Sequence, residues 1–391
     1  MKCLYRLAQS LCITFFLSHS ICAQETEGYK TNSEIKKTLA DSASMSFHFA
    51  AWSYSFIGEY QKALSAFDRA LESESAEDCD NNVVLSNYES ISAKDYIVDQ
   101  SKNEQIIIVN EAHHQPLHRV FTESLLEGLY QNGFRYLGLE ALAEDSLINI
   151  RKWPMQNDGY YSKEPQFGNM IRKALKIGFF VFGYEADGNG KIREIGQAKN
   201  IQKVLNQDPG AKILLHCGFN HVVEGDYPAW GKAMAGQLKE LSGINPLTID
   251  QVELSEHNSP NFESPCYKPE QIDFSAVLID KKHKPVNPGA DSAQTDLQII
   301  HPRTKFISGR PDWLQRNNAW KVFDLTTIKF DVKFPCLVGA YYENEDENAV
   351  PVDQIEINNQ SEKALILPAG NFVLRISDQE GITKTQKIIV E

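Results

Sequence analysis

Hydrophobic residues between positions 95 and 257 follow two alternating patterns. Short runs that are apolar throughout, typical of buried strands, alternate with longer stretches whose apolar positions recur at helical spacing. The predicted strands are residues 105–109, 136–139, 179–184 and 212–216, and the predicted helices are residues 117–132, 170–177, 192–206 and 230–242. Fully apolar strands that alternate with helices favour a mostly parallel sheet covered by helices on both faces. We therefore expect an α/β fold.

Other patterns flank this region. Residues 31–76 have helical spacing, and the string GEYQKALSAFDRALE (58–72) resembles the second helix of a tetratricopeptide repeat. Because a solenoid needs about three such units, a single helical hairpin packed on the main domain is expected. After residue 321, short alternating strands separated by turns predict a small antiparallel β-sandwich, and residues 276–280 are expected to extend the main sheet. The chain is therefore predicted to consist of a signal peptide (1–23), a helical segment (24–94), an α/β domain (95–320) and a β-sandwich (321–391).

The first 23 residues resemble a secretory signal peptide. A basic start is followed by a short apolar run and by small residues before Gln24, which predicts cleavage there and a periplasmic or extracellular location. The residues before Cys22 lack the small side chain that a lipid anchor requires, so we do not expect lipidation. Cleavage would leave Cys79, Cys217, Cys266 and Cys336, of which Cys79 and Cys266 could form one disulfide.

Composition and charge limit the classes of molecule that the chain is expected to bind. The chain has 391 residues and a net charge of −13, from 39 basic and 52 acidic residues. An acidic chain repels phosphate backbones, so we expect no nucleic-acid partner. No apolar run reaches the roughly 18 residues of a membrane span. The oligomeric state stays open.

Acidic residues and histidines follow each of the four predicted strands. Asn110 to His114 follow the first, Glu140 the second, and Glu185 the third, while His216 to His221 and then Glu224 follow the fourth. Because the carboxyl ends of parallel strands share one edge of a sheet, these groups should converge. Glutamates and histidines in one cleft are what acid–base catalysis or metal binding requires.

Four of these strings resemble motifs of one superfamily. They are N-E-A-H-H-Q-P-L-H-R (110–119), L-E (139–140), R-E-I-G-Q-A-K-N-I (193–201) and G-F-N-H (218–221). In order and spacing they are similar to elements shared by erythromycin esterases, ChaN-type haem-binding proteins and the TraB/TIKI proteases. The resemblance covers about residues 100–255. The chain departs from the pattern at Asn110, where glycine is usual, and at Gln197, where methionine is usual.

The resemblance implies site residues. Glu111 and His113 belong to the first motif, with His114 as a rival histidine, and Glu140 and His221 complete the catalytic set. Arg119 or Arg193 would neutralise an oxyanion or hold a carboxylate. The further residues that we expect to contact the substrate are His118, Glu185, His216 and Glu224.

Three functions stay open. A histidine oriented by a glutamate could activate water and a second histidine could protonate the leaving group, which predicts an exported hydrolase of an ester, lactone or amide in a small molecule or peptide. A divalent metal held by Glu111, His113, Glu140 and His221 could activate the water instead. The ChaN-type resemblance implies non-catalytic haem or iron binding, with His118 or Tyr160–Tyr161 as exposed axial ligands. The flanking segments favour an envelope interaction module.

Overall fold

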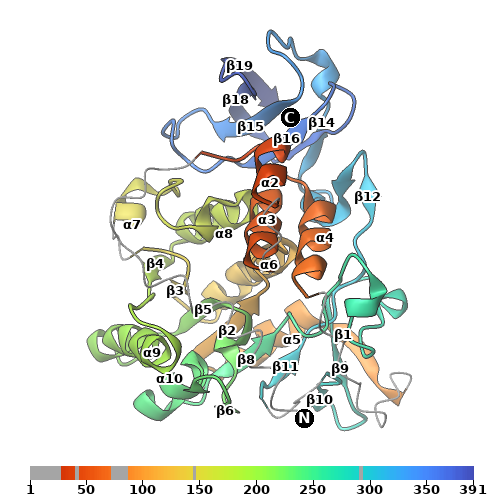
Figure 1. The fold of residues 1–391 in the computed structure, drawn as a ribbon. Helices are drawn as coiled ribbons and strands as arrows, with labels where there is room; N and C mark the ends of the chain where they lie inside the picture. The colour runs from red at the N-terminus through yellow and green to blue at the C-terminus, as the bar shows by residue number, and fades with distance from the viewer. Residues whose placement is uncertain (1–27, 40–43, 72–86, 144–146, 290–293) are drawn as a thin grey trace.

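A computed structural model describes residues 28–39, 44–71, 87–143, 147–289 and 294–391 (Figure 1). The predicted signal peptide and Cys79 lie outside these ranges. Cys266 is disulfide-bonded, whereas Cys217 and Cys336 carry free thiols. In the described part of the chain, no helix is both long and apolar enough to cross a membrane.

A six-stranded parallel sheet lies at the centre, with strand order β11-β8-β2-β5-β3-β4. Its strands are β2 (Ile106–Glu111), β3 (Tyr136–Leu139), β4 (Phe180–Gly183), β5 (Ile213–Gly218), β8 (Leu247–Asp250) and β11 (Leu297–Gln298). The four predicted strands are all present, and their parallel pairing is confirmed. Both β2 and β5 are buried at every position, which explains their unbroken apolar runs.

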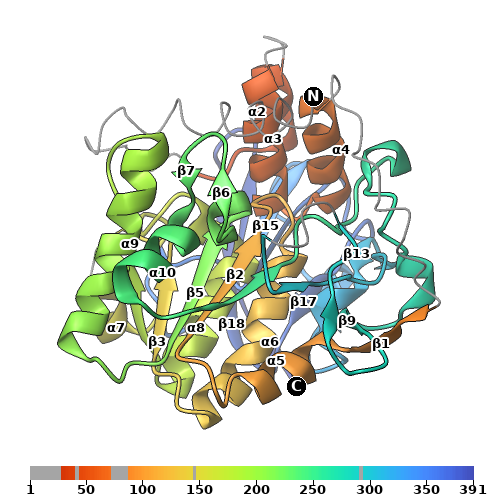
Figure 2. The ribbon, with the colours of Figure 1, turned by 90° about the horizontal axis from the view of Figure 1, so that it is seen from below.

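Helices cover both faces of this sheet (Figure 2). One face packs on α5 (Ala93–Gln100), α6 (Leu117–Gln131) and α8 (Pro165–Ile177). The other packs on α9 (Gly190–Gln207) and α10 (Met234–Ser242). Alternate residues of β2 divide between the two cores, since Ile107 faces the first group of helices and Ile108 the second. The short helix α7 (Leu147–Arg151) lies beside β4.

The prediction that residues 276–280 extend the main sheet is wrong. These residues form β9 (Ala276–Ile279), which pairs antiparallel with β1 (Glu89–Ser92) and β10 (Pro285–Val286) in a separate sheet. An apolar run indicates burial but not the identity of the neighbouring strand.

Two N-terminal helices pack closely against each other. They are α3 (Ser44–Phe56) and α4 (Tyr60–Ala70), preceded by α2 (Asn32–Thr38). The turn between them passes through Gly58 at φ +70°, where a Cβ atom would lie 2.5 Å from Arg310 Nη1. The pair lies between the main sheet and the C-terminal strands (Figure 1).

The C-terminal region contains antiparallel sheets. One has four strands in the order β16-β15-β18-β19, and β14 pairs with β17. The bounds are β14 (Lys321–Phe323), β15 (Cys336–Tyr342), β16 (Asp353–Ile357), β17 (Leu365–Leu367), β18 (Gly370–Asp378) and β19 (Thr383–Val390). Residues 328–334 lie among the short alternating stretches but do not form a strand. Phe330 and Val332 still pack on the apolar core here, so the alternation reflects burial without ladder hydrogen bonds.

Candidate functional site

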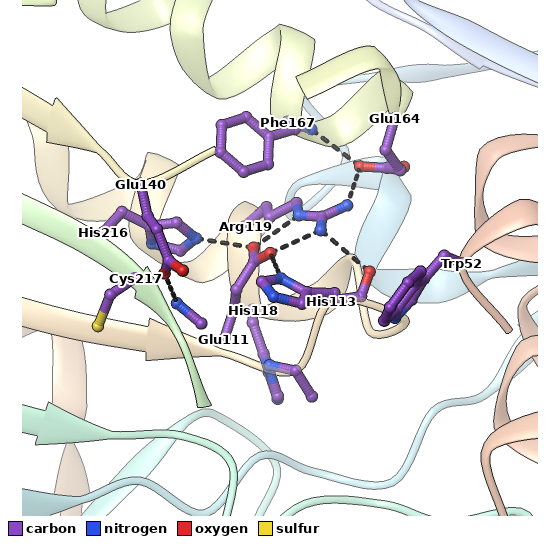
Figure 3. Close-up of polar contacts among 12 residues, drawn as sticks. Trp52, Glu111, His113, His118, Arg119, Glu140, Glu164, Phe167, His216 and Cys217 are labelled. Carbon is purple, nitrogen blue, oxygen red and sulfur yellow. Dashed lines mark hydrogen bonds and ion pairs between the residues drawn. The ribbon is translucent and has the colours of Figure 1, made fainter. Parts of the chain in front are cut away.

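Glu111, the last residue of β2, is the centre of a buried group that we call the Glu111 cluster: Glu111, His113, Arg119, Glu164 and His216 (Figure 3). Arg119, on α6, donates from Nε to Glu111 Oε2 and from Nη2 to Oε1, both over 2.6 Å. His113 Nδ1 lies 2.8 Å from Oε1, and His216 Nε2 lies 2.7 Å from Oε2. The carboxylate therefore has four polar contacts.

These contacts fix the tautomer of His113. Burial works against ionisation of Glu111, but the Arg119 guanidinium outweighs it and holds the Glu111 pKa well below its usual range. An ionised carboxylate only accepts hydrogen bonds, so His113 must donate from Nδ1. When the ring is neutral, Nε2 then carries the lone pair, and it makes no hydrogen bond to any residue that the structure describes.

The ring of His113 has aromatic neighbours on several sides. Tyr161 stacks on it with 3.7 Å between ring centroids, and Trp52 and Phe219 meet it edge-on at 6.1 and 5.1 Å. Trp52 comes from α3, so an N-terminal helix contributes to the surroundings of the site.

Gly218, at the end of β5, allows a close approach between two strand ends. A Cβ atom there would lie 2.6 Å from His113 Nε2 and 3.5 Å from Glu140 Oε2. Any other residue would therefore collide with the imidazole. The absence of a side chain lets the open nitrogen of His113 lie on the same side of Gly218 as the carboxylate of Glu140.

A second group of charged residues, the Glu140 cluster, consists of Glu140, Glu185, Arg193, Glu194 and His221. Arg193 Nη2 donates to Glu140 Oε1 over 2.5 Å, and the Gly218 N–H donates to Oε2 over 2.6 Å. Burial opposes ionisation here too, but His221 and Arg193 lower the Glu140 pKa to about 2. Glu185, which follows β4, receives two further hydrogen bonds from Arg193.

His221 has a partner for either protonation state. Its Nδ1 lies 2.7 Å from Glu194 Oε2, and its Nε2 lies 2.8 Å from Arg193 Nη1 and 3.3 Å from Glu140 Oε1. A neutral ring accepts from Arg193 at Nε2, whereas a protonated ring donates toward Glu140. Burial favours the neutral form, but Glu140 and Glu194 together raise the His221 pKa.

Of the two roles that the sequence suggested for the arginines, both side chains have the second, because each holds carboxylates. Arg119 uses its donors on Glu111, on Glu164 Oε2 at 3.0 Å and on the His113 carbonyl at 3.0 Å. Arg193 uses its donors on Glu140, Glu185 and His221. Both therefore hold the protein's own carboxylates and are not open to a substrate oxyanion.

Three other predicted residues lie apart from the two clusters. The rival histidine His114 stacks on Phe67 at 3.7 Å, is buried, and finds no hydrogen-bond partner for either ring nitrogen among the residues that the structure describes. His118 is fully buried and accepts from the Ala112 N–H, so its expected role as an exposed haem ligand is wrong. Glu224 pairs with Lys239 and Thr248.

Sequence reasoning missed two acids of the clusters. Glu164 caps the N-terminus of α8 by accepting from Phe167 N–H, and no strand end signals it. Glu194 stands within the R-E string that carried the resemblance, so the motif offered a signal for it. The unusual Asn110 donates to the Phe219 carbonyl and to Asp250, which ties the end of β2 to the segment that carries His221.

The predicted metal ligands do not fit a metal as they stand. Both carboxylate oxygens of Glu111 are occupied by Arg119 and histidine donors, and those of Glu140 by Arg193 and a backbone N–H. Among the described residues, no three His, Cys, Asp or Glu side chains are grouped to hold an ion.

Comparison with known proteins finds no matching family model and no matching curated protein. Among solved structures, the type III effector HopBA1 matches 56% of this chain and 99% of its own, at 12% identity and a TM-score of 0.34. RRSP, a MARTX toxin effector domain from Vibrio vulnificus CMCP6, matches 59% of this chain and 48% of its own, at 13% identity and 0.29. A structure described as bacterial protein toxins matches 60% and 48%, at 11% identity and 0.31. The chain thus spans about half the length of the last two.

Proposed function

We propose that this chain is an exported hydrolase of the erythromycin esterase, ChaN and TraB/TIKI type that cleaves an ester, lactone or amide. The observation that carries the proposal is the Glu111–His113 pair, in which Nδ1 is bound to a buried carboxylate and Nε2 is left open. A carboxylate-oriented imidazole is the usual general base for activating water.

In this mechanism, water binds at His113 Nε2. His113 takes a proton from the water while the water oxygen bonds to the substrate's carbonyl carbon, and the π electron pair of the carbonyl moves to its oxygen to give a tetrahedral oxyanion. Glu111 stabilises the imidazolium that forms. The carbon–oxygen or carbon–nitrogen bond then breaks, and its electron pair leaves with the alcohol or amine. The carbonyl bond re-forms as the oxyanion collapses, and protonated His221 supplies the proton for this leaving group. His113 then releases its proton to solvent, and His221 takes one up from solvent.

The outer segments have a supporting role in the proposal. We regard α3 and α4 as a helical hairpin and the C-terminal strands as a β-sandwich that holds it in place. Leu337 of β15 packs on the helices, and Trp52 of α3 contacts His113. A structural role in supporting the site would explain why an enzyme has these segments, even if they bind no partner.

The test is hydrolysis of a panel of esters, lactones and peptides by the purified mature protein and by the His113→Asn variant. Loss of a general base lowers kcat/KM by about 10²- to 10⁴-fold. Glu224→Gln is the matched control. Glu224 was also predicted from the sequence to contact the substrate, but it lies outside both clusters. The proposal fails if the wild type cleaves nothing, or if His113→Asn retains wild-type rates.

A further inference from the structure

The proposed reaction creates a negatively charged oxygen, and the usual donors near His113 are already in use. Arg119 and Arg193 are held by glutamates, and the Gly218 N–H is bound to Glu140 at 2.6 Å. The carboxylates of Glu111 and Glu140 would repel the new charge. Hydrolysis at this site therefore needs a donor that the protein does not already use.

Tyr161 has the properties of such a donor. It opens the 3₁₀ turn Tyr161–Lys163, and its ring lies parallel to that of His113 within 14° at 3.7 Å. The side chain is half-buried, and its hydroxyl makes no hydrogen bond to any described residue. The Tyr161 ring therefore lies directly against the proposed base, and it carries a hydroxyl that no described residue uses.

The surroundings keep this hydroxyl protonated. Burial, together with the neighbouring Tyr160 and Glu140, raises the Tyr161 pKa well above its usual value. The Glu140 carboxylate is among the causes of this shift, and it lies on the same side of Gly218 as the open His113 nitrogen. A neutral phenol can donate to an oxyanion without the strong attraction that would bind an arginine to the nearby glutamates.

We propose that Tyr161 is a catalytic residue, whose hydroxyl donates a hydrogen bond to the oxyanion of the tetrahedral intermediate. This inference rests on the proposed hydrolase function. The alternative is that the ring only holds His113 in place by stacking, in which case the hydroxyl has no catalytic effect.

The Tyr161→Phe variant separates the two roles, since it removes the hydroxyl and keeps the stacking ring. We expect kcat to fall by about 10²- to 10³-fold, as for other single oxyanion donors, with KM nearly unchanged. Tyr160→Phe is the matched control, because its ring contacts Trp52 and Phe56 and has no ring contact with His113. That variant should keep wild-type kinetics. Unchanged kcat in Tyr161→Phe would overturn the assignment while leaving the hydrolase proposal intact.

A binding measurement makes the test independent of turnover. Calorimetric titration with a phosphonate monoester, a stable mimic of the tetrahedral oxyanion, should show at least about tenfold weaker binding to Tyr161→Phe than to Tyr160→Phe. If the wild type hydrolyses nothing but this difference is found, the hydrolase proposal fails, and Tyr161 is a hydrogen-bond donor to a bound anion and not a catalytic residue. If the wild type binds the phosphonate no better than Tyr161→Phe does, the assignment is wrong.

Discussion

The two charged clusters at the carboxyl edge of the sheet hold their histidines differently. In the Glu111 cluster, two glutamates share Arg119, and His113 has one nitrogen fixed and one open. In the Glu140 cluster, three glutamates surround Arg193, and both nitrogens of His221 have partners. The larger excess of negative charge around His221 favours its protonated form. The first arrangement therefore suits a base, whereas the second suits a proton reservoir.

The largest expected effect comes from Glu111→Gln. A glutamine amide can donate to His113, which would move the lone pair from Nε2 to Nδ1, and Arg119 would lose its charged partner. By analogy with the Asp→Asn change in serine protease triads, we expect kcat to fall about 10⁴-fold. Breaking the buried pair should also cost about 3–5 kcal/mol of unfolding free energy. Initial rates and urea unfolding measure the two effects.

The Glu224→Gln variant provides the comparison for both measurements. Glu224 also forms a hydrogen-bonded ion pair, with Lys239 at 2.7 Å, but the lysine side chain is 45% exposed. We expect an effect of no more than about 1 kcal/mol, because exposed pairs contribute little. Equal losses in the two variants would mean that the Glu111 cluster has no special role.

The second prediction concerns acid unfolding of the Glu140 cluster. The folded Glu140 pKa of about 2 lies below its unfolded value. The stabilising contribution is therefore present above about pH 4.5 and is lost as the pH falls through 2. At neutral pH this depression corresponds to roughly 3 kcal/mol. Glu140→Gln should show a lower unfolding free energy than the wild type at pH 6, and the gap should close toward pH 2. A constant gap across this range would contradict the assignment.

The third prediction separates the acid from the base by pH dependence. Because Glu140 and Glu194 raise the His221 pKa, the protonated ring persists to a higher pH than in an ordinary imidazole and is lost as the pH rises through that raised value. The wild-type rate should therefore decline as the pH becomes more alkaline and passes through the His221 pKa. His221→Asn should lower kcat by about 10²-fold, at the small end of general-acid effects, and should lose this alkaline decline. If the decline persists in the variant, His221 is not its source.

Strand-end reasoning found most of the site because it depends on a single physical fact. Once β2, β3, β4 and β5 are parallel, the residues after them must meet at one edge, whatever the details of packing. Glu111, Glu140, Glu185 and His221 were predicted in this way. Glu164 was not predicted, because it caps a helix and contacts Arg119 from there. A periodic pattern does not indicate which distant charged residue a capping side chain will contact.

The remaining features depend on contacts between distant parts of the chain. The position of Trp52 beside His113 depends on how α3 docks, and an amphipathic helix shows only that one side is buried. The partner of β9 was mistaken for the same reason. Arg119 and Arg193 were predicted to lie near the site, and they do. The number of carboxylates that each guanidinium binds could not be predicted, because it depends on tertiary contacts.

The smallest expected effect concerns the neighbouring histidines that the sequence could not separate. His114 is buried against Phe67, and burial lowers its pKa well below the usual value, so the ring is neutral with both nitrogens unpartnered. Such a group costs about 1–3 kcal/mol of stability, while a slightly larger apolar ring adds some packing strain. His114→Phe should therefore fold with a stability within about 1 kcal/mol of the wild type, or slightly above it, and should keep its rate within about threefold. Urea unfolding and the ester assay measure both quantities. A rate loss in His114→Phe as large as that in His113→Asn would restore His114 as the catalytic histidine, because stacking on Phe67 alone gives no reason for such a loss.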